Sequence, residues 1–471
     1  MAYGYWKSGM LAHRATFNLH FRRPPFDGGY TLACGQGLVA EFLEAFRYQA
    51  EDLAYLAGLE TGKGGPLFEE AFLRYLEGLR LSCDVHAVPE GTVVFPHEPL
   101  LRVEGPLLEA QLLETALLTL MNFQSLVATK AARMTLAARG APVLEFGLRR
   151  AQGIDGALAA SRAAYLGGCS GTSNVLAGKL FGIPVKGTQA HSWILSFDDE
   201  REAFLAFARA LPDQTVLLVD TFDTLEGVRR AVAAGRWLQE RGHRLAGVRL
   251  DSGDLAYLSR EARRLLDEAG FQDAAIVASN ELDEHLIESL RGQGAAVTAW
   301  AVGTRLVTAH DDPALGGVYK LSAVQRPGGA WEPRVKLSEQ AVKTSTPGRL
   351  QIRRYHEAGR PAADMIYDLD RPPGKEPLIV DPLDSTRRRK LDGKDAVELL
   401  EPLLEGGRLA RPPEPLAEAR RRVQVQLASF HEGVKRLANP HRFLVGLEKG
   451  LYELRTRLIL EARGLKGGAL T

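Results

Sequence analysis

A histidine in a short polar segment is the first residue of this chain that could do chemistry. In GTQAHSW, residues 187–193, His191 follows Gly187 and Thr188. An imidazole is available in its neutral form near pH 7, so His191 could act as a nucleophile or as a proton carrier. The alternative is a purely structural histidine, which is the more common role of a single histidine. Position alone leaves both interpretations open.

Arginine and aspartate side chains meet in a second segment, VRLDSGDL, residues 248–255. Arg249 and Asp251 could bridge the hydroxyls of a sugar and a phosphate, or bind Mg²⁺ carried by a pyrophosphate. In the alternative interpretation, Asp251 or Ser252 caps the amides of the helix that follows. Both can be true of one turn. Asp220, in VDTFDT, ends another apolar run and adds a carboxylate.

Three more segments carry groups that bind anions. Arg149, in EFGLRRAQG, has a planar guanidinium that could hold a carboxylate or phosphate through two parallel hydrogen bonds, or could tie loops together. Residues 170–174 resemble a helix start whose free amides bind an anion or only cap the helix. Gly303 and Thr304, in AVGTRL, resemble the strand–glycine–helix phosphate site that often lies late in a βα barrel.

Seven short apolar runs must position these residues. The runs are rich in Val, Ile and Leu and are separated by amphipathic stretches, which is typical of buried parallel strands in successive βα units. They span residues 142–150, 182–192, 215–224, 245–255, 274–282, 296–306 and 316–322. The pattern predicts an α/β fold with a βα barrel.

The loops that follow parallel strands meet at one face of such a barrel, so we expect the polar residues that end the strands to surround one cavity. These residues are Arg149, Thr188, His191, Asp220, Arg249, Asp251, Ser279, Asn280, Gly303, Thr304 and Lys320. Their arginines, carboxylates and small donors suit an anionic, phosphorylated ligand.

The two ends of the chain have a different pattern, typical of an antiparallel α+β fold. Residues 15–23 alternate between apolar and polar, which predicts a half-buried strand. Residues 83–104 predict more strands, and 107–138 predict a long helix. Further helices are predicted at 37–46, 66–79, 415–430 and 443–461, and short strands at 365–367 and 378–380. Segment 325–355 predicts a loop that could reach over the barrel mouth.

The bulk composition is that of a globular protein. With 471 residues, two or three domains are expected, and 45% hydrophobic and 25% charged residues exclude disorder as the main state. A net charge of +1 gives no overall field that would attract nucleic acid or a membrane. Cys34, Cys83 and Cys169 form no CxxC pair, so we expect a reducing, cytoplasmic setting. Charged residues interrupt the most apolar stretch, 107–134, so no membrane span is expected.

Together these motifs resemble the nicotinate phosphoribosyltransferase family over nearly the whole chain. EFGLRRAQG, SNVLAG, GTxAHS, VDT, VRLDSGDL, SNEL, VGT, GGVYKL and KLSE…K.T.PGR occur in the family's order. The resemblance implies an irregular TIM-like barrel of the type II phosphoribosyltransferases, beside an α+β module built from both chain ends. The expected domains are 1–115, 116–335 and 336–471, the barrel being the second. A homodimer with active sites at the subunit boundary is also implied.

The resemblance implies a reaction and a role for each matching residue. Nicotinate would join 5-phosphoribosyl-1-pyrophosphate, releasing pyrophosphate, in NAD salvage, with Mg²⁺ and with ATP as co-substrate. His191 and Asp251 would be catalytic, and ATP would transiently phosphorylate His191. The substrate-binding residues would be Arg149, Gly187, Thr188, Ser192, Asn174, Asp220, Arg249, Ser279, Asn280, Gly303 and Thr304. Arg149 with Ser192 and Gly187 would hold the nicotinate carboxylate, and Gly303 with Thr304 the 5′-phosphate. The metal ligands stay open, as do contacts from Lys336 and Lys343.

The alternatives are a nicotinamide or quinolinate phosphoribosyltransferase, or a non-catalytic phosphoribosyl-binding protein. Relatives that act on nicotinamide have an aspartate near the position of Asn174, so a neutral Asn174 favours the acid over the amide. In the family, an aromatic residue ahead of the segment that matches residues 1–9 stacks on the pyridine from the partner subunit. This sequence begins at that segment, so either translation starts upstream or the ring clamp is incomplete.

Overall fold

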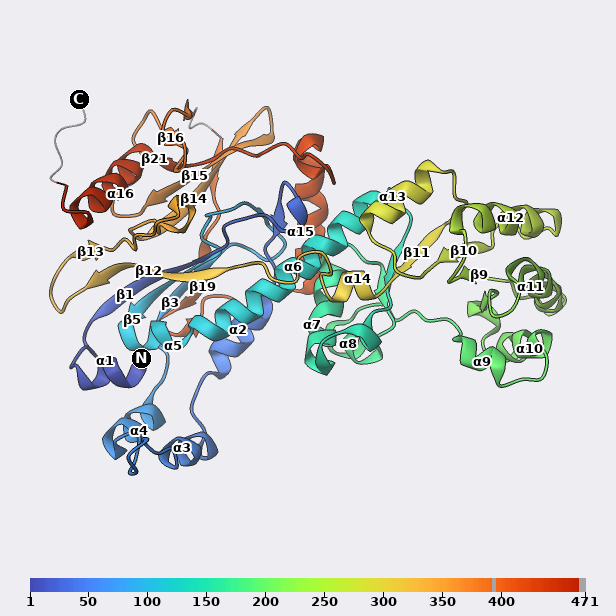
Figure 1. The fold of residues 1–471 in the computed structure, drawn as a ribbon, viewed down its shortest axis with the longest axis horizontal. Helices are drawn as coiled ribbons and strands as arrows, with labels where there is room; N and C mark the ends of the chain where they lie inside the picture. The colour runs from blue at the N-terminus through green and yellow to red at the C-terminus, as the bar shows by residue number, and fades with distance from the viewer. Residues whose placement is uncertain (392–394, 466–471) are drawn as a thin grey trace. The chain divides into compact units, whose positions relative to one another are not determined.

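A computed structural model describes residues 1–391 and 395–465. The chain forms two compact units, which we describe separately (Figure 1). Unit 1 combines Met1–Ser125 with Ala314–Thr471, and unit 2 is Leu126–Pro313. The three domain ranges expected from the sequence, 1–115, 116–335 and 336–471, stay a prediction.

Unit 2 is built on a curled parallel sheet that forms half of a barrel. The order of the six strands is β7-β6-β11-β10-β9-β8. Their bounds are β6 Val143–Glu145, β7 Gly171–Thr172, β8 Val216–Leu218, β9 Gly247–Leu250, β10 Ala275–Ala278 and β11 Ala299–Val302. Neighbouring strands run parallel. The mixed α/β class expected from the sequence is therefore confirmed, with a half-barrel as its parallel sheet.

Two of the seven predicted barrel strands are wrong. Residues 182–192 form no regular strand and contribute one bridge, between Thr172 and Val185. Pro184 sits within this run and cannot donate a ladder hydrogen bond, and β7 is the sixth strand instead. Residues 316–322 enter β12, Val318–Gln325, which is antiparallel to strands of unit 1. Lys320 therefore pairs with Asn18 in unit 1 and does not end a strand of the half-barrel.

Helices follow the strands of unit 2, and short acidic caps fix where several of them begin. Asp223, Asp254 and Asp283 each accept a hydrogen bond from a backbone amide in the first turn of α11, α12 and α13. The helices are α7 Gly153–Leu166, α8 Val175–Phe181, α9 His191–Leu195, α10 Glu200–Ala210, α11 Thr224–Gln239, α12 Leu255–Glu268, α13 Glu284–Gly292 and α14 Thr304–Val307. In Figure 1, α11 and α12 lie beside β9 and β10.

The first turn of α11 contacts the backbone just past β8. A Cβ atom added at Gly227 would lie 2.0 Å from the carbonyl oxygen of Val219, the residue before Asp220. Helix and strand can approach this closely only because Gly227 has no side chain.

Replacing Gly227 with Ala is expected to lower the free energy of unfolding by about 1–3 kcal/mol, because the helix must shift away from the strand. Gly156→Ala in α7 is the matched control: nothing lies within 4 Å of an added Cβ there, so it should be neutral or stabilising by up to about 1 kcal/mol. Urea denaturation measures both. A Gly227→Ala protein as stable as Gly156→Ala would show that the contact carries no constraint.

Unit 1 contains two larger sheets, both of which join distant parts of the sequence. One has the order β13-β12-β1-β5-β3-β19-β20 and the other β17-β16-β21-β15-β14-β18; β2 and β4 form a pair. Their strands are β1 Arg14–His20, β2 Thr31–Leu32, β3 Asp84–Ala87, β4 Val93–Val94, β5 Leu101–Pro106, β12 Val318–Gln325, β13 Trp331–Pro333, β14 Leu350–Glu357, β15 Arg360–Asp368, β16 Leu378–Val380, β17 Arg388–Lys390, β18 Ala396–Glu398, β19 Glu401–Glu405, β20 Arg408–Leu409 and β21 Val445–Glu448.

The expectation that residues 15–23 form a half-buried strand is wrong in one respect. All residues from Ala15 to Leu19 are buried, so both faces of β1 are covered. Both edges of the strand are occupied as well, because β1 pairs with β12 on one side and with β5 on the other. Of its buried polar side chains, Asn18 donates its amide to Ser322 Oγ at 2.7 Å.

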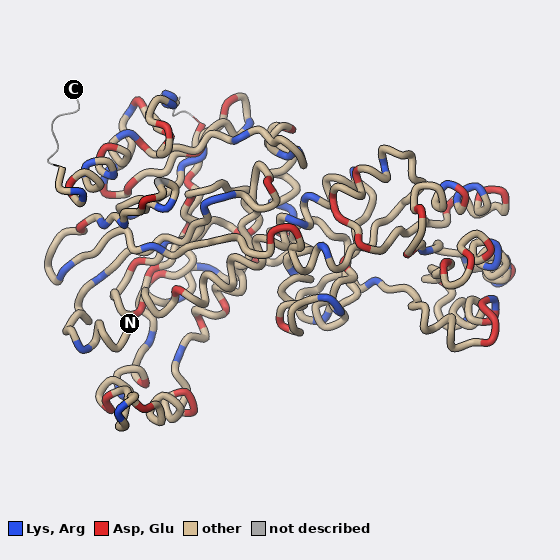
Figure 2. Tube along the Cα trace, in the orientation of Figure 1, with Lys and Arg blue, Asp and Glu red and all other residues tan. Residues whose placement is uncertain are grey.

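The helices predicted at 37–46, 66–79 and 415–430 are confirmed, whereas the helices Ala2–Lys7 and Ala50–Ala57 were not predicted. The predicted helix 107–138 is divided into two, and the start of the predicted helix 443–461 is wrong because Val445–Glu448 form a strand. The helices of unit 1 are α1 Ala2–Lys7, α2 Gln36–Ala45, α3 Ala50–Ala57, α4 Glu70–Gly78, α5 Leu107–Leu112, α15 Leu416–Ser429 and α16 Lys449–Ala462, and α6 Glu114–Ala138 continues from unit 1 into unit 2. Across the described ranges, no helix combines the length and apolarity that crossing a membrane requires. Lys and Arg are interspersed with Asp and Glu within each unit (Figure 2).

Candidate active site

A cavity of about 310 Å³ opens where the loops follow the strands of unit 2. Arg149 comes after β6, Ser173 after β7, and Arg249 with Asp251 stand at the end of β9. The cavity is lined by Phe146, Leu148, Arg149, Ser173, Gly187, Thr188, Gln189, Ala190, His191, Leu218, Arg249 and Asp251. Six residues predicted from the sequence are therefore brought together: Arg149, Gly187, Thr188, His191, Arg249 and Asp251.

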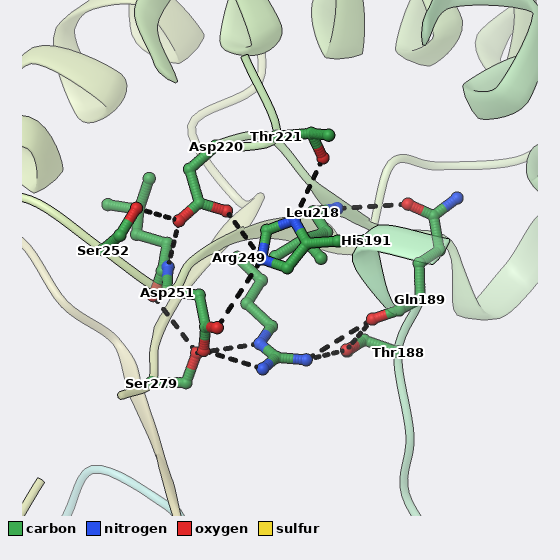
Figure 3. A network of polar contacts seen from close by, with 11 residues as sticks. Thr188, Gln189, His191, Leu218, Asp220, Thr221, Arg249, Asp251, Ser252 and Ser279 are labelled. Atoms are coloured by element: carbon green, nitrogen blue, oxygen red, sulfur yellow. Dashed lines mark hydrogen bonds and ion pairs between the residues drawn. The ribbon is translucent and has the colours of Figure 1, made fainter. Parts of the chain in front are cut away.

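The guanidinium of Arg249 is the centre of the polar network in this cavity (Figure 3). Nε donates to Ser279 Oγ at 2.8 Å, one Nη to Thr188 Oγ1 at 2.9 Å, and the other to Asp251 Oδ1 at 2.8 Å. The side chain is only 12% exposed. Side chains from three separate segments thus hold the planar fork in one orientation, which preorganises it for an anion.

The carboxylate of Asp251 is kept ionised by its neighbours. Burial opposes ionisation, but the hydrogen bond from Ser279 and the charge of Arg249 outweigh it and hold the pKa of Asp251 below its ordinary range. Ser279 donates its hydroxyl to the same Oδ1 that accepts from Arg249. Asp251 therefore enters the site as a fixed negative charge at neutral pH.

Asp251→Asn is expected to lower the free energy of unfolding at pH 7 by about 1 kcal/mol, the difference between a charge-assisted and a neutral hydrogen bond. Because the folded pKa is depressed, this contribution is complete above the unfolded pKa of about 3.9 and is lost as the pH falls through the folded pKa. Urea denaturation between pH 3 and pH 7 should show the two proteins converging in acid. Asp273→Asn, at an exposed position, is the control, and a difference that grows in acid would contradict the assignment.

His191 faces two carboxylates with one ring nitrogen and a threonine with the other. Its Nδ1 lies 3.1 Å from Thr221 Oγ1, while Nε2 lies 3.7 Å from Asp251 Oδ2 and 4.0 Å from Asp220 Oδ1. Asp220 is almost fully buried; its Oδ2 accepts from the Asp251 amide at 3.0 Å and from Ser252 Oγ at 2.6 Å. Oδ1 of Asp220 has no hydrogen-bond partner among the described residues. Two carboxylate oxygens are thus directed toward one imidazole edge.

The sequence offered helix capping as an alternative role in two segments. In the first segment another residue is the cap, and in the second the predicted cap is confirmed. Asp254, not Asp251 or Ser252, caps α12 by accepting from the Tyr257 amide at 3.0 Å, which leaves Asp251 to the cavity. Asn174 caps α8: its Oδ1 accepts from the Ala177 amide at 3.2 Å. Its Nδ2 donates to Ser161 Oγ at 3.2 Å, so both ends of this buried amide are used.

The other predicted residues lie outside the cavity lining. Ser192 is exposed on α9, next to His191, which begins that helix and does not stand on a turn past a strand as predicted. Asn280 is exposed just after β10 with a left-handed backbone (φ 103°). Gly303 precedes the single-turn helix α14, and Thr304 Oγ1 donates to Glu281 at 2.9 Å.

Two residues of the network were missed by the sequence analysis. Thr221 contacts the His191 ring, and its only signal is its place directly after Asp220. Gln189 is 4% exposed, and its carbonyl accepts from Arg249 at 3.4 Å. Neither type of side chain marks a site by itself, so neither residue is predictable from the local pattern.

The sequence pattern of the nicotinate phosphoribosyltransferase (NAPRTase) family matches residues 142–328, which include the cavity. The patterns of the NAPRTase N-terminal and C-terminal domains match residues 1–122 and 349–455. A nicotinate phosphoribosyltransferase of Bacillus subtilis is 41% identical over 98% of this chain and 94% of its own length. The chain belongs to the nicotinate phosphoribosyltransferase family. A human relative with the same name is 38% identical over 96% of this chain and 94% of its own.

Solved structures agree with this membership. The crystal structure of human nicotinic acid phosphoribosyltransferase superposes with a TM-score of 0.85 at 35% identity, covering 97% of this chain and 98% of that one. The nicotinate-nucleotide pyrophosphorylase of Pyrococcus furiosus gives a TM-score of 0.68 at 23% identity, over 91% of this chain and 92% of its own, and so shares the fold. The nicotinate phosphoribosyltransferase fold is thus present over nearly the full chain.

Proposed function

We propose that the chain joins nicotinate to 5-phosphoribosyl-1-pyrophosphate, giving nicotinate mononucleotide and pyrophosphate, and that ATP hydrolysis drives the reaction. The observation that carries this proposal is the group of Arg249, Asp251 and His191 around one cavity in a chain of this family. The nicotinate ring nitrogen attacks C1 of the ribose, and the C1–O bond breaks with its electron pair leaving on pyrophosphate. The product serves NAD salvage, and the reaction is cytoplasmic.

The site must bind the negative charge of the pyrophosphate leaving group. Arg249 is preorganised by Ser279, Thr188 and Asp251, so its fork meets the ribosyl pyrophosphate without reorganising. The fixed negative charge of Asp251 faces the ribose, whose centre becomes oxocarbenium-like as pyrophosphate leaves. Gly303 and Thr304 take the 5′-phosphate, with Ser279 and Asn280 on the neighbouring turn. These roles follow the match of each motif to the family.

The pyridine side of the site is assigned to Arg149. This residue lines the same cavity and is exposed, so its fork is free to hold the nicotinate carboxylate in two parallel hydrogen bonds. Gly187 and Ser192 assist it. The neutral amide of Asn174, close to Ser173 in the chain, leaves the carboxylate without a repelling charge.

His191 couples the reaction to ATP. A ring nitrogen of His191 attacks the γ-phosphorus of ATP, an N–P bond forms, and the bond to the bridging oxygen breaks with its electron pair leaving on ADP. Hydrolysis of the N–P bond later restores the imidazole and releases phosphate. The contact with Thr221 holds the ring in place, and Asp220 and Asp251 stabilise positive charge on it.

The residues around His191 also fit Mg²⁺. Oδ1 of Asp220 and Oδ2 of Asp251 are hard oxygen ligands directed at one region, and the first has no hydrogen-bond partner among the described residues. Within the described ranges, no group of three or more His, Cys, Asp or Glu could hold a metal ion, so the two carboxylates would hold Mg²⁺ only together with a bound substrate. Mg²⁺ bound there would neutralise charge on the pyrophosphate.

A homodimer with shared active sites is supported by apolar side chains on the surface of unit 2. On α8, Val175, Leu176 and Leu180 are 69%, 44% and 56% exposed, and the nearby Val185 is 47% exposed. A second copy of the chain would cover this patch.

The test is an assay of the purified protein with phosphoribosyl pyrophosphate, Mg²⁺ and ATP, and with one of three pyridines. We expect nicotinate mononucleotide from nicotinate, with ADP and phosphate formed beside it, and no nucleotide from nicotinamide or quinolinate. Product from either of those pyridines but not from nicotinate would overturn the substrate assignment. Binding of phosphoribosyl pyrophosphate with no product from any pyridine would identify a non-catalytic binding protein.

A further inference from the structure

Gln189 occupies the place where the sequence predicted a strand next to β8. In the order of the described strands, β8 ends the sheet and pairs only with β9. On its other side, the Leu218 amide donates to the side-chain Oε1 of Gln189 at 3.2 Å (Figure 3). A side-chain amide therefore replaces the backbone carbonyl that a neighbouring strand would have offered.

The same residue stands between two groups of the candidate active site. Thr188, which precedes it, accepts a hydrogen bond from Arg249 at 2.9 Å, and the carbonyl of Gln189 accepts a second one at 3.4 Å. His191 follows two residues later and begins α9. The segment 187–191 has no ladder hydrogen bonds of its own, so it is tied to the sheet by side-chain contacts, with Arg249 of β9 and with Leu218 of β8. The contact with Leu218 is the one that holds it on the edge of β8.

We propose that Gln189 is a positioning residue, which fixes Thr188 against Arg249 and His191 against the two carboxylates by holding segment 187–191 on the edge of β8. The inference deepens the proposed function, and its link to binding rests on that function. Both partners are buried, Leu218 at 1% and Gln189 at 4% exposure, so loss of the acceptor would leave an unpaired amide inside the protein. The segment would then leave the strand to let water reach Leu218.

Three variants separate positioning from simple stability. Gln189→Met keeps the length and apolar body but removes the acceptor, whereas Gln189→Glu keeps an acceptor oxygen at the same reach. Gln239→Met makes the same chemical change at an exposed position on α11 and is the control. If Gln189→Met does not fold, Gln189→Asn, which draws the amide back by one methylene, replaces it with the same expectation.

The first measurement is hydrogen exchange of peptides that contain Leu218 and segment 187–191, in the absence of any ligand. Exchange should become at least about tenfold faster in Gln189→Met, as expected for a lost buried hydrogen bond, and stay within about threefold of the original in Gln189→Glu and Gln239→Met. The second is the Kd of phosphoribosyl pyrophosphate with Mg²⁺ by calorimetry, which should rise about tenfold in Gln189→Met and stay unchanged in Gln239→Met. Gln189→Glu serves the exchange measurement alone, because its added negative charge would itself repel the anionic ligand.

The outcomes distinguish this inference from the proposed function. If the original protein does not bind phosphoribosyl pyrophosphate, the proposed function fails, and the exchange measurement still decides whether Gln189 holds the segment. If the original protein binds it, unchanged exchange at Leu218 together with an unchanged Kd in Gln189→Met overturns the inference. A lower melting temperature with unchanged Kd and exchange overturns it as well, because that result describes a structural role alone.

Discussion

His191→Ala is expected to abolish transfer of the γ-phosphoryl group of ATP to the protein. No other nucleophilic side chain is in contact with both Asp220 and Asp251 among the described residues, so nothing replaces the imidazole. ATP-stimulated formation of nicotinate mononucleotide should fall by about 100-fold or more, as for loss of a nucleophile or proton carrier. Incubation with γ-labelled ATP followed by alkaline gel electrophoresis detects the phosphorylated chain.

The matched control is His285→Ala, at an exposed position on α13 of the same unit. It should keep full labelling and activity. The fold and the affinity for phosphoribosyl pyrophosphate should survive in His191→Ala, because Arg249 keeps its partners Ser279, Thr188 and Asp251. Labelling that persists in His191→Ala would place the phosphoryl group elsewhere and end the coupling role proposed for this histidine.

Arg249→Lys is the second change with a large expected effect. The ammonium group of lysine is a point charge, so it cannot reproduce the fork that reaches Ser279, Thr188 and Asp251 at once. Loss of two charge-assisted hydrogen bonds, at about 1.5–3 kcal/mol each, predicts a fall of about 100-fold or more in kcat/KM. Steady-state kinetics with varied phosphoribosyl pyrophosphate measures it.

The control for this change is Arg236→Lys on the exposed side of α11, which should leave kcat/KM within about twofold. We expect the loss in Arg249→Lys mainly as a higher KM for phosphoribosyl pyrophosphate, with the KM for nicotinate nearly unchanged because Arg149 is intact. A rise confined to the KM for nicotinate would contradict this assignment and would show that Arg249 binds the pyridine and not the phosphates.

The parallel strands were predictable where an apolar run ends in a polar turn. Residues 215–224, 245–255, 274–282 and 296–306 satisfy this pattern and contain β8, β9, β10 and β11. Residues 316–322 have the same composition but lie in an antiparallel sheet. An apolar run specifies a buried strand and not its partner, because partners are chosen by pairing between distant segments.

The candidate site was predictable to the extent that its residues end strands. Arg249 and Asp251 are brought together by one short turn, whereas Arg149 and His191 join them only through the fold. Gln189 and Thr221 act through contacts between segments 29 and 30 residues apart in the chain, which no local pattern records. Within a single turn the sequence is ambiguous as well. Asp251 and Asp254 lie three residues apart, and only the geometry of the helix start shows that Asp254 is the residue that caps α12.

The short strand β8, at the edge of the parallel sheet, could pair with other protein chains, and segment 187–191 reduces that risk. An uncovered strand edge offers unpaired amides and carbonyls to any other extended chain, which is how many folded proteins begin to aggregate. In β8 the amide nearest the cavity is already occupied by Gln189. The contact that we propose to position the candidate active site thus also occupies an edge amide that another chain could otherwise pair with.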